Sequence, residues 1–545
     1  AQRAPLLLDV VRTYDALGRI DEVIPLAREA ARLQPAQAEY VAAGALADVA
    51  DGKADAAVTT LDALLQREPS SAPALIARAR ARFAQEDVAK AFIDLEAART
   101  AAPKDPRIPL WEGRFNLALG KTSDAETALL RAVRLSDADP TPTLELGRAE
   151  LEAGDVEAAL GRAEAAVAMA PEDPRAHVLA GDVYVRRGQI DQALAEFRRA
   201  GALDRYDLDA KLGEANMLRE RAEREEAPAA SDDLARATEL YTEALEDAPD
   251  DPRVLFEYGR ALELSGEETR ALQLYEKAAA SDRTDPRPHL RMTAAFLQRE
   301  PPNVQRARSA LDVAREIERE TGKPLTEVRY WEARVALREG RVREAISSMR
   351  QAVEKEPRNA SYHYWLGRAL EKNGSLYEAI ASYEQAVLLN SRFAAAQRAL
   401  GWTELERHRF SEARKWFARY RETAPHDASI WADIGESWVR QNRDDKALAA
   451  FQKALAANAE DARALLHVGN ILSRKGQERA ALQRFEQVVA RDPDHGEAWC
   501  LIGISRSQRR VTREARAALD RCLELESAPP DLQEMARNII ETPSR

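Results

Sequence analysis

The sequence is poor in cysteine and in long apolar runs, and each shortage excludes a class of protein. Two cysteines in 545 residues cannot form a disulfide framework or a four-thiolate metal site. No run approaches the roughly 20 apolar residues that a membrane-spanning helix needs. Basic residues are also outnumbered, because 80 Lys and Arg face 92 Asp and Glu, a formal net charge of −12. A nucleic-acid surface needs a basic footprint, so we expect no nucleic-acid partner and no direct membrane span.

Motifs for catalysis and for cofactor binding are missing as well. The seven His residues show no His-x-x-x-His spacing of the kind that binds metal. Gly120-Lys121-Thr122 lacks the glycine that a phosphate-binding loop carries five residues earlier, where Phe115 stands. We interpret Cys500 and Cys522 as reduced packing residues on the two helices of one repeat. The expectation is a protein that is not an enzyme and has no catalytic residue, cofactor or metal.

What the sequence does contain is a repeat. An Ala begins a short motif, Ala-x-x-x-apolar-x-x-small, at intervals of 34 residues in two series. The first series is Ala57, Ala91, Ala125, Ala159 and Ala193, and the second is Ala345, Ala379, Ala413, Ala447, Ala481 and Ala515. Another small residue, Ala or Gly, stands twelve positions before each of them. A constant period of this length indicates stacked repeats, and it sets the fold class before any local propensity is considered.

Each repeat predicts two helices. In the segment 360–393, SYHYWLGRALEKN and YEAIASYEQAVLL carry apolar and small residues at spacings of three and four, as amphipathic helices do. A Gly between the two helices permits the left-handed backbone that ends a helix. These turn glycines are Gly18, Gly52, Gly120, Gly154, Gly188, Gly266, Gly340, Gly374 and Gly476. A Pro near the end of many second helices stops them, because Pro has no N–H to donate.

The residues at fixed positions within the repeat point to a known family. The segment 428–461 carries Trp431, Ile434-Gly435, Trp438, Ala447, Phe451 and Ala454 in one register. This pattern resembles the tetratricopeptide repeat, and the resemblance covers nearly the whole chain. It implies an all-α, right-handed α-solenoid of about fifteen stacked helix-turn-helix units, with a C-terminal capping helix. The resemblance also implies a concave groove, lined mainly by the first helix of each unit, that binds peptides or helices of partner proteins.

The repeats fall into three groups and a tail. Six regular units are expected over 4–207, three less regular units over 208–325, six regular units over 326–529, and a capping helix and tail over 530–545. The irregular group contains insertions, which we expect as the polar stretch 220–233 between two helices, QREPPN in a turn, and a stretched end at ETGKPLTE. We expect this group to act as a looser joint between two regular arms.

Basic and aromatic residues gather at the first-helix positions that would face the groove. Seven of the fifteen ninth positions are Arg, and Arg pairs bidentately with carboxylates. We therefore expect protein or peptide partners with acidic segments. The candidate groove residues are Arg80, Arg114, Arg148, Arg260, Tyr330, Arg334, Arg338, Tyr364, Arg368, Lys372, Arg398 and Trp402. The alternative is that these Arg side chains are solvated or pair with Glu and Asp of the adjacent helix.

Two further features narrow the function. The Lys-x-x-x-Asn pairing of the family's carboxylate clamp is absent from consecutive units, which argues against a co-chaperone that binds chaperone tails. Trp431, Trp438 and Trp499 are expected in the core.

Three functions remain open from the sequence. The first is a non-enzymatic protein-interaction scaffold in the cytoplasm, and the composition, rich in Ala and Arg, is typical of bacteria. The second is a periplasmic or envelope scaffold of an exopolysaccharide or pilus export machine. The chain begins Ala-Gln-Arg without Met, so we expect a processed or trimmed product, and a targeting segment lost in this way would favour the second function. The third, a substrate-feeding array for a catalytic domain, has no residues in this sequence to support it.

Overall fold

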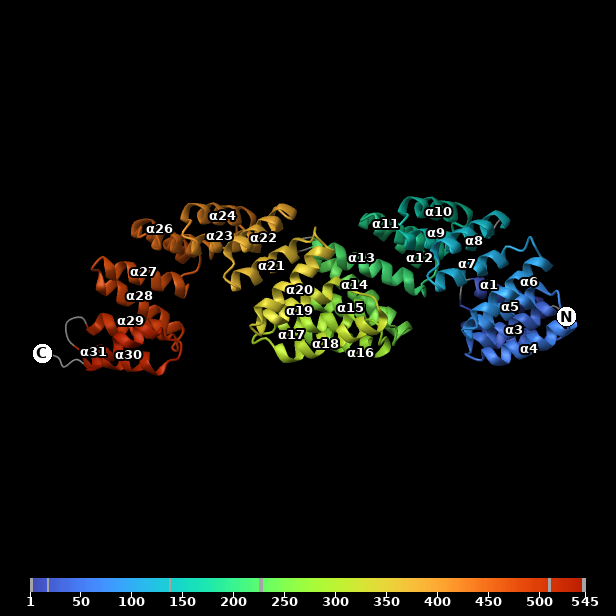
Figure 1. The fold of residues 1–545 in the computed structure, drawn as a ribbon, viewed down its shortest axis with the longest axis horizontal. Coiled ribbons are helices and arrows are strands. Elements are labelled where there is room, and N and C mark those ends of the chain that lie inside the picture. Colours follow the sequence, from blue (N-terminus) through green and yellow to red (C-terminus); the bar gives the residue numbers. More distant parts are fainter. Residues whose placement is uncertain (1–2, 17–18, 137–138, 225–228, 508–510, 542–545) are drawn as a thin grey trace. The chain divides into compact units, whose positions relative to one another are not determined.

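The computed structural model describes residues 3–16, 19–136, 139–224, 229–507 and 511–541. These residues form α-helices and one short 3-10 helix, and no strand occurs among them (Figure 1). The chain divides into two compact units, Ala1–Asp282 and Arg283–Arg545. The expected all-α solenoid is confirmed: over the described residues the helices form fifteen consecutive pairs, followed by a single helix at the C-terminal end.

The first unit contains eight helix pairs, counted over its described residues. Odd-numbered helices are the first helices of their repeats and even-numbered helices are the second. They are α1 (Arg3–Ala16), η1 (Ile20–Val23), α2 (Ile24–Leu33), α3 (Ala38–Ala50), α4 (Ala54–Arg67), α5 (Ala72–Ala84), α6 (Val88–Ala101), α7 (Arg107–Ala118), α8 (Thr122–Leu135), α9 (Thr141–Ala153), α10 (Val156–Met169), α11 (Pro174–Arg186), α12 (Ile190–Leu203), α13 (Leu208–Arg224), α14 (Ala229–Asp247), α15 (Pro252–Leu264) and α16 (Glu268–Ser281).

The second unit contains seven pairs and a terminal helix, again over its described residues. They are α17 (Arg287–Gln298), α18 (Val304–Thr321), α19 (Thr326–Arg338), α20 (Val342–Lys355), α21 (Ala360–Lys372), α22 (Leu376–Leu389), α23 (Ala394–Glu406), α24 (Phe410–Thr423), α25 (Ile430–Val439), α26 (Asp444–Ala457), α27 (Ala462–Arg474), α28 (Glu478–Arg491), α29 (Gly496–Ser507), α30 (Arg513–Glu524) and α31 (Pro530–Glu541). Helix α31 packs on α29 and α30, so the expected capping helix is present.

The turn between the two helices of a pair has the expected left-handed backbone conformation. Gly374 adopts φ +80° directly after α21, a conformation that residues with a Cβ rarely adopt. Seven further turn glycines have positive φ, and Gly18 lies outside the described residues. Pro stands at the first or second position of several first helices, where no intrahelical donor is lost.

The 34-residue register places one large ring of the second helix against a small residue of the first. A Cβ added to Gly435 would lie 2.7 Å from the ring of Phe451, which is completely buried. Equivalent rings recur one period apart at Tyr383, Phe417, Phe451 and Phe485. The glycine therefore lets the two helix axes approach, and the ring fills the space between them.

The insertions differ from their predicted form. Most of the stretch 220–233 is helical, because α13 continues to Arg224 and α14 begins at Ala229. Its Glu, Arg and Ala residues are strong helix formers, and ion pairs such as Arg221–Asp233 at 2.5 Å hold the two helices together. The QREPPN turn is largely as expected, and in the expected stretched end ETGKPLTE the first two residues close α18, residues 322–325 are not helical, and α19 begins at Thr326. The predicted joint over 208–325 stays a prediction.

Cys500 and Cys522 correct another expectation, since they form a disulfide and are not reduced. The first lies on α29 and the second on α30, with their Cα atoms 4.8 Å apart. Both side chains are fully buried where the two helices of the last pair meet. Two cysteines 22 residues apart in sequence gave no sign of this, because the contact depends on how the two helices face each other.

Candidate partner-binding surfaces

In the first unit, two of the candidate groove arginines already have carboxylate partners. Arg80 on α5 donates two hydrogen bonds to the carboxylate of Asp15 on α1, at 2.7 and 2.8 Å. Arg114 on α7 pairs with Glu145 on α9 at 2.6 Å. Both guanidinium groups also lie over the ring of Trp111, at 3.9 and 4.6 Å from its centroid. Arg80 thus connects the first helices of the third and first repeats, and Arg114 connects the first helices of two neighbouring repeats.

The other two candidates in this unit differ from each other. Arg260 on α15 forms ion pairs with Glu257 at 3.2 Å and Glu223 at 3.5 Å. Arg148 on α9 is partly buried and makes no hydrogen bond or ion pair with the part of the chain that the structure describes. Arg148 influences the nearby carboxyl group of Asp182. Burial raises the pKa of Asp182 to about 6, and the positive charge of Arg148 opposes part of this increase. Arg148 is therefore the cation of this set that a ligand could pair with.

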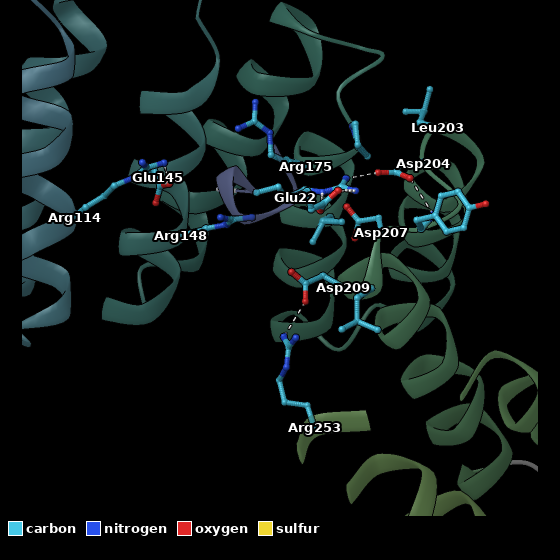
Figure 2. A pocket seen from close by; sticks show the side chains of 15 residues that line it. Glu22, Arg114, Glu145, Arg148, Arg175, Leu203, Asp204, Asp207, Asp209 and Arg253 are labelled. Atoms are coloured by element: carbon cyan, nitrogen blue, oxygen red, sulfur yellow. Dashed lines mark hydrogen bonds and ion pairs between the residues drawn. The ribbon is translucent and has the colours of Figure 1, made fainter. Parts of the chain in front are cut away.

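Arg148 lines a cavity of about 600 Å³ in the first unit (Figure 2). Its charged lining residues are Arg19, Glu22, Arg114, Glu145, Arg148, Arg175, Asp204, Asp207, Asp209 and Arg253. Two ion pairs, Arg19–Asp204 and Arg253–Asp209, are formed between residues that line the cavity, each at 2.8 Å. Because cations and carboxylates are nearly balanced there and many are paired, the cavity shows no preference for a ligand of one charge.

In the second unit, aromatic rings surround Arg334 on α19. Its guanidinium lies 4.3 Å from the ring centroid of Trp365 and 4.7 Å from that of Trp331, and it donates a hydrogen bond to the Tyr330 hydroxyl at 3.2 Å. No carboxylate of the described residues lies within ion-pair distance of Arg334. Aromatic rings and the Tyr330 hydroxyl hold this arginine in place, and its remaining N–H donors have no anionic partner among the described residues.

The equivalent arginine of the next repeat, Arg368 on α21, has a similar environment. It donates a hydrogen bond to the Tyr364 hydroxyl at 3.0 Å and lies 5.8 Å from the ring centroid of Trp365. Its only ion pair with described residues is a long one, 3.6 Å to Glu371 on the same helix. Arg334 and Arg368 therefore share Trp365, and the four predicted residues Tyr330, Arg334, Tyr364 and Arg368 lie together as one surface, the Arg334–Arg368 cluster.

Two predicted cations flank this cluster. Lys372 donates a hydrogen bond from its Nζ to the backbone carbonyl of Leu337 at 2.9 Å. Arg338 is exposed and forms no hydrogen bond or ion pair with residues that the structure describes. Lys372 thus links the ends of two neighbouring first helices, whereas the Arg338 side chain is available to a ligand.

Arg398 and Trp402, on α23, belong to a different arrangement. The Arg398 Nε donates to Asp433 at 2.7 Å, and Arg463 donates to the other oxygen of the same carboxylate at 2.6 Å. Asp433 is fully buried, so these two arginines neutralise it. Trp402 is partly buried and packs edge-on against Phe417. Arg398 is therefore occupied by an internal pair, as the alternative interpretation of the sequence expected.

The structure thus gives the predicted first-helix arginines different environments. Trp331 and Trp365, which hold the Arg334–Arg368 cluster, were not among the predicted residues. A signal was present, since each Trp stands three residues before an Arg, on one face of its helix and one period apart. The described residues include no group of three or more His, Cys, Asp or Glu side chains that could hold a metal ion. Among the helices described, none has the length and apolar character to cross a membrane.

Comparison with known sequence families agrees with this geometry. The profile of one tetratricopeptide repeat group matches residues 42–106, 144–207, 330–387, 377–428 and 469–531, more than half of the chain. A second tetratricopeptide repeat profile matches residues 229–295. The chain belongs to the tetratricopeptide repeat family. No curated protein matches the full sequence of this tetratricopeptide repeat (TPR) chain.

Two solved structures are similar to the TPR chain. The structure titled "Crystal structure of APC/C hetero-tetramer Cut9-Hcn1" has a TM-score of 0.50 at 13% identity, covering 89% of this chain and 99% of the other. The structure titled "Crystal structure of YrrB: a TPR protein with an unusual peptide-binding site" has a TM-score of 0.28 at 23% identity, covering 36% of this chain and all of the other. The first likeness supports the TPR fold. Family and fold together support a protein-interaction scaffold.

Proposed function

We propose that this TPR chain is a non-enzymatic scaffold that binds an acidic segment of a partner protein along its first helices, at the Arg334–Arg368 cluster. The observation that carries the proposal is that Arg334 stacks on aromatic rings and has no carboxylate partner among the described residues. Arg398 has the opposite arrangement, because a buried carboxylate neutralises it.

The chemistry of the cluster suits a carboxylate. Stacking on rings fixes the guanidinium plane and removes water from its faces, but leaves N–H donors at its edge. A carboxylate can accept two of these donors in a planar, bidentate pair. Tyr330 and Tyr364 each already accept a hydrogen bond from the neighbouring arginine, so their rings are held beside the site. An acidic side chain that binds here finds pre-ordered donors, which reduces the entropy lost on binding.

The proposal is tested with a labelled, unstructured acidic peptide in which Asp alternates with Gly, and with the matching Asn peptide. Fluorescence anisotropy with the full chain should show binding of the Asp peptide only. The double variant Arg334→Glu, Arg368→Glu should weaken binding at least about tenfold, since two charge-assisted pairs are lost. The control Arg343→Glu, Arg350→Glu makes the same charge change on α20, where both residues are exposed. Equal binding by both double variants would reject the cluster as the site.

A second candidate is an envelope scaffold, and the Cys500–Cys522 disulfide favours it. Disulfides persist in oxidising compartments such as the periplasm and are rare in a reducing cytoplasm. The partner-binding chemistry is the same for both locations. Thiol alkylation in intact cells, quenched with acid and read by mass spectrometry, distinguishes them. A disulfide in the native cell supports the envelope location, and two alkylated thiols support the cytoplasm.

A further inference from the structure

A second basic and aromatic surface is formed by α24, α25 and α26 of the second unit, which are different helices from those of the Arg334–Arg368 cluster, α19 and α21. Trp431 and Trp438 stand seven residues apart on α25 and are only partly buried. Each ring carries two cations, one from each flanking second helix. Arg414 and Lys446 lie 3.7 and 4.6 Å from the ring centroid of Trp438. We call these side chains, with the equivalent set at Trp431, the double-tryptophan surface.

The arrangement at Trp431 repeats that at Trp438. Arg421 on α24 lies 4.8 Å from the Trp431 ring centroid, and Lys453 on α26 lies 4.1 Å from it. Each of these cations comes seven residues after its counterpart on the same helix, or two helical turns. Residues seven apart on a helix are about 10 Å apart along its axis and share one face. The surface therefore presents two rows of cations, each with a spacing of about 10 Å, on either side of two indole rings.

None of these four cations has a carboxylate partner among the residues that the structure describes. Arg414 donates a hydrogen bond to the side-chain oxygen of Gln441 at 3.1 Å, and Arg421, Lys446 and Lys453 are exposed without an ion pair. Burial lowers the pKa of Arg414, and no nearby carboxylate opposes this. The chain has a net charge of −12, yet this surface gathers four cations that have no carboxylate partner among the described residues.

The repeat itself shows that packing alone does not require these residues. The residues 34 positions before and after Arg414 are Ile380 and Leu448. Those 34 positions before and after Arg421 are Val387 and Leu455. Lys446 stands where the two preceding repeats have Glu378 and Glu412. Apolar residues at these positions bury surface without the cost of placing like charges side by side. At the register of Lys453 the preceding repeat already has Arg419, so the surface departs from its own repeat toward positive charge at Arg414, Arg421 and Lys446.

From this we infer that the double-tryptophan surface is a docking site for an acidic α-helix of a partner protein, separate from the first-helix groove. A helix with Glu at i, i+3, i+7 and i+10 presents two rows of carboxylates with the same spacing of about 10 Å along its axis. Such a helix places one row toward Arg414 and Arg421 and the other toward Lys446 and Lys453. The two rows lie about 60° apart around the helix axis with no residue between them, so the Cβ and Cγ methylene groups of the Glu side chains contact the indole rings.

Charge and geometry favour a protein helix over other anions. A nucleic acid needs many phosphate contacts, and the net charge of −12 repels a dense polyanion at longer range. An anionic membrane is repelled for the same reason, and four cations give it only a weak attachment. A helix with four carboxylates matches four cations and carries little excess charge beyond the contact.

The test uses three labelled helical peptides of about 20 residues and the full chain. One has Glu at i, i+3, i+7 and i+10, the second has four Glu residues distributed around the helix, and the third has Gln in place of Glu. Fluorescence anisotropy should give the tightest binding for the first peptide, by about tenfold over the second at equal net charge. Binding should weaken with salt, because exposed ion pairs are screened.

Two double variants locate the site. The double variant Lys446→Glu, Lys453→Glu should bind the first peptide at least about tenfold more weakly, because two favourable pairs become repulsive. Arg343→Glu, Arg350→Glu on α20 has the same change in charge and spacing and should change binding by less than about twofold. The Arg334→Glu, Arg368→Glu variant should also bind the helical peptide normally, which separates this surface from the groove.

Three outcomes would overturn the inference. One is equal affinity for the first two peptides, because the spacing would then be irrelevant. Another is equal loss of binding in the Lys446→Glu, Lys453→Glu variant and the α20 control, since only net charge would then matter. The third is binding of duplex RNA or of phosphatidylserine vesicles that exceeds peptide binding and is lost in the Lys446→Glu, Lys453→Glu variant. Circular dichroism of each variant should match the parent, because the substituted lysines are exposed.

Discussion

Arg19 and Asp204 stand 185 residues apart in the sequence and form an ion pair at 2.8 Å within the first unit. Arg19 lies just before η1 in the first repeat, and Asp204 follows α12 in the sixth. Most other helix contacts of this unit join neighbours in the sequence, so this pair is a long-range link of the kind that repeat proteins rarely make. Arg19 also forms an ion pair with Glu22, and Arg19 and both of its carboxylate partners line the cavity shown in Figure 2.

We predict that Arg19→Ala opens this link without unfolding the unit. Both partners are partly exposed, so the loss in free energy of unfolding should be about 0–1 kcal/mol. Hydrogen exchange of the backbone amides near residues 19–23 and 204–208 should become faster, and exchange in α7 and α8 should not change. Uniformly faster exchange throughout the unit would contradict the prediction, because it would indicate a structural role in the core.

Asp182 predicts a dependence of stability on pH. Burial raises its folded-state pKa to about 6, above the ordinary value near 3.8. The folded state then holds the proton more tightly than the unfolded state, so this residue's stabilising contribution is complete below pH 3.8 and is lost as the pH rises through about 6. At pH 7.5, Asp182→Asn should therefore be more stable than the parent by an amount on the order of 1–3 kcal/mol.

Urea unfolding of the parent and of Asp182→Asn at several pH values checks this. The difference between the two proteins should grow from pH 4 to pH 7 and then level off. A difference that shrinks over this range would contradict the sign, and the burial of the charged carboxylate would then not govern its pKa.

Replacing Gly435 or Gly374 with Ala should destabilise the fold for different reasons and to different extents. At Gly435 the added Cβ meets the buried Phe451 ring at 2.7 Å, so the core must shift, at a cost of about 1–3 kcal/mol. At Gly374 nothing lies within 4 Å, and the cost is the left-handed backbone at φ +80°, about 1 kcal/mol. Thermal melting of both variants measures the costs. A larger loss for Gly374→Ala than for Gly435→Ala would refute the packing role of Gly435.

Asp433 should be required for stability and not for partner binding. Asp433→Asn leaves Arg398 and Arg463 without the buried carboxylate that they share, and both arginines are about one third exposed. We expect a loss of about 1–3 kcal/mol, reduced by the access of water to the arginines. Arg338→Ala is the control, because Arg338 is exposed and unpaired among the described residues. An unchanged melting temperature for Asp433→Asn would contradict the stabilising role of the shared carboxylate.

The sequence predicted the helices well because their determinants are local. The 34-residue register predicted the turn at Gly374 and a small residue at the position of Gly435, since both depend on residues of one repeat. The insertion 220–233 was the exception. A polar stretch was expected as a loop, but its helix-forming residues continue α13 and α14.

The binding surfaces were predicted only in part. Arg80, Arg334 and Arg398 all lie on first helices, and apart from the Trp three residues before Arg334 no local feature of the sequence distinguishes them. Their partners do, and the partners lie in other helices: Asp15 for Arg80, the ring of Trp365 for Arg334, and Asp433 for Arg398.

By itself, therefore, the sequence determined the repeat, the helix pairs and the family, because period, turn glycines and apolar spacing act within about 34 residues of chain. Only the tertiary structure decided which cations are neutralised, that Cys500 and Cys522 are joined, and that Trp431 and Trp438 each carry two cations. The physical reason is that ion pairs, disulfides and ring contacts require side chains from different helices to meet within a few ångströms, and composition and periodicity do not specify that meeting.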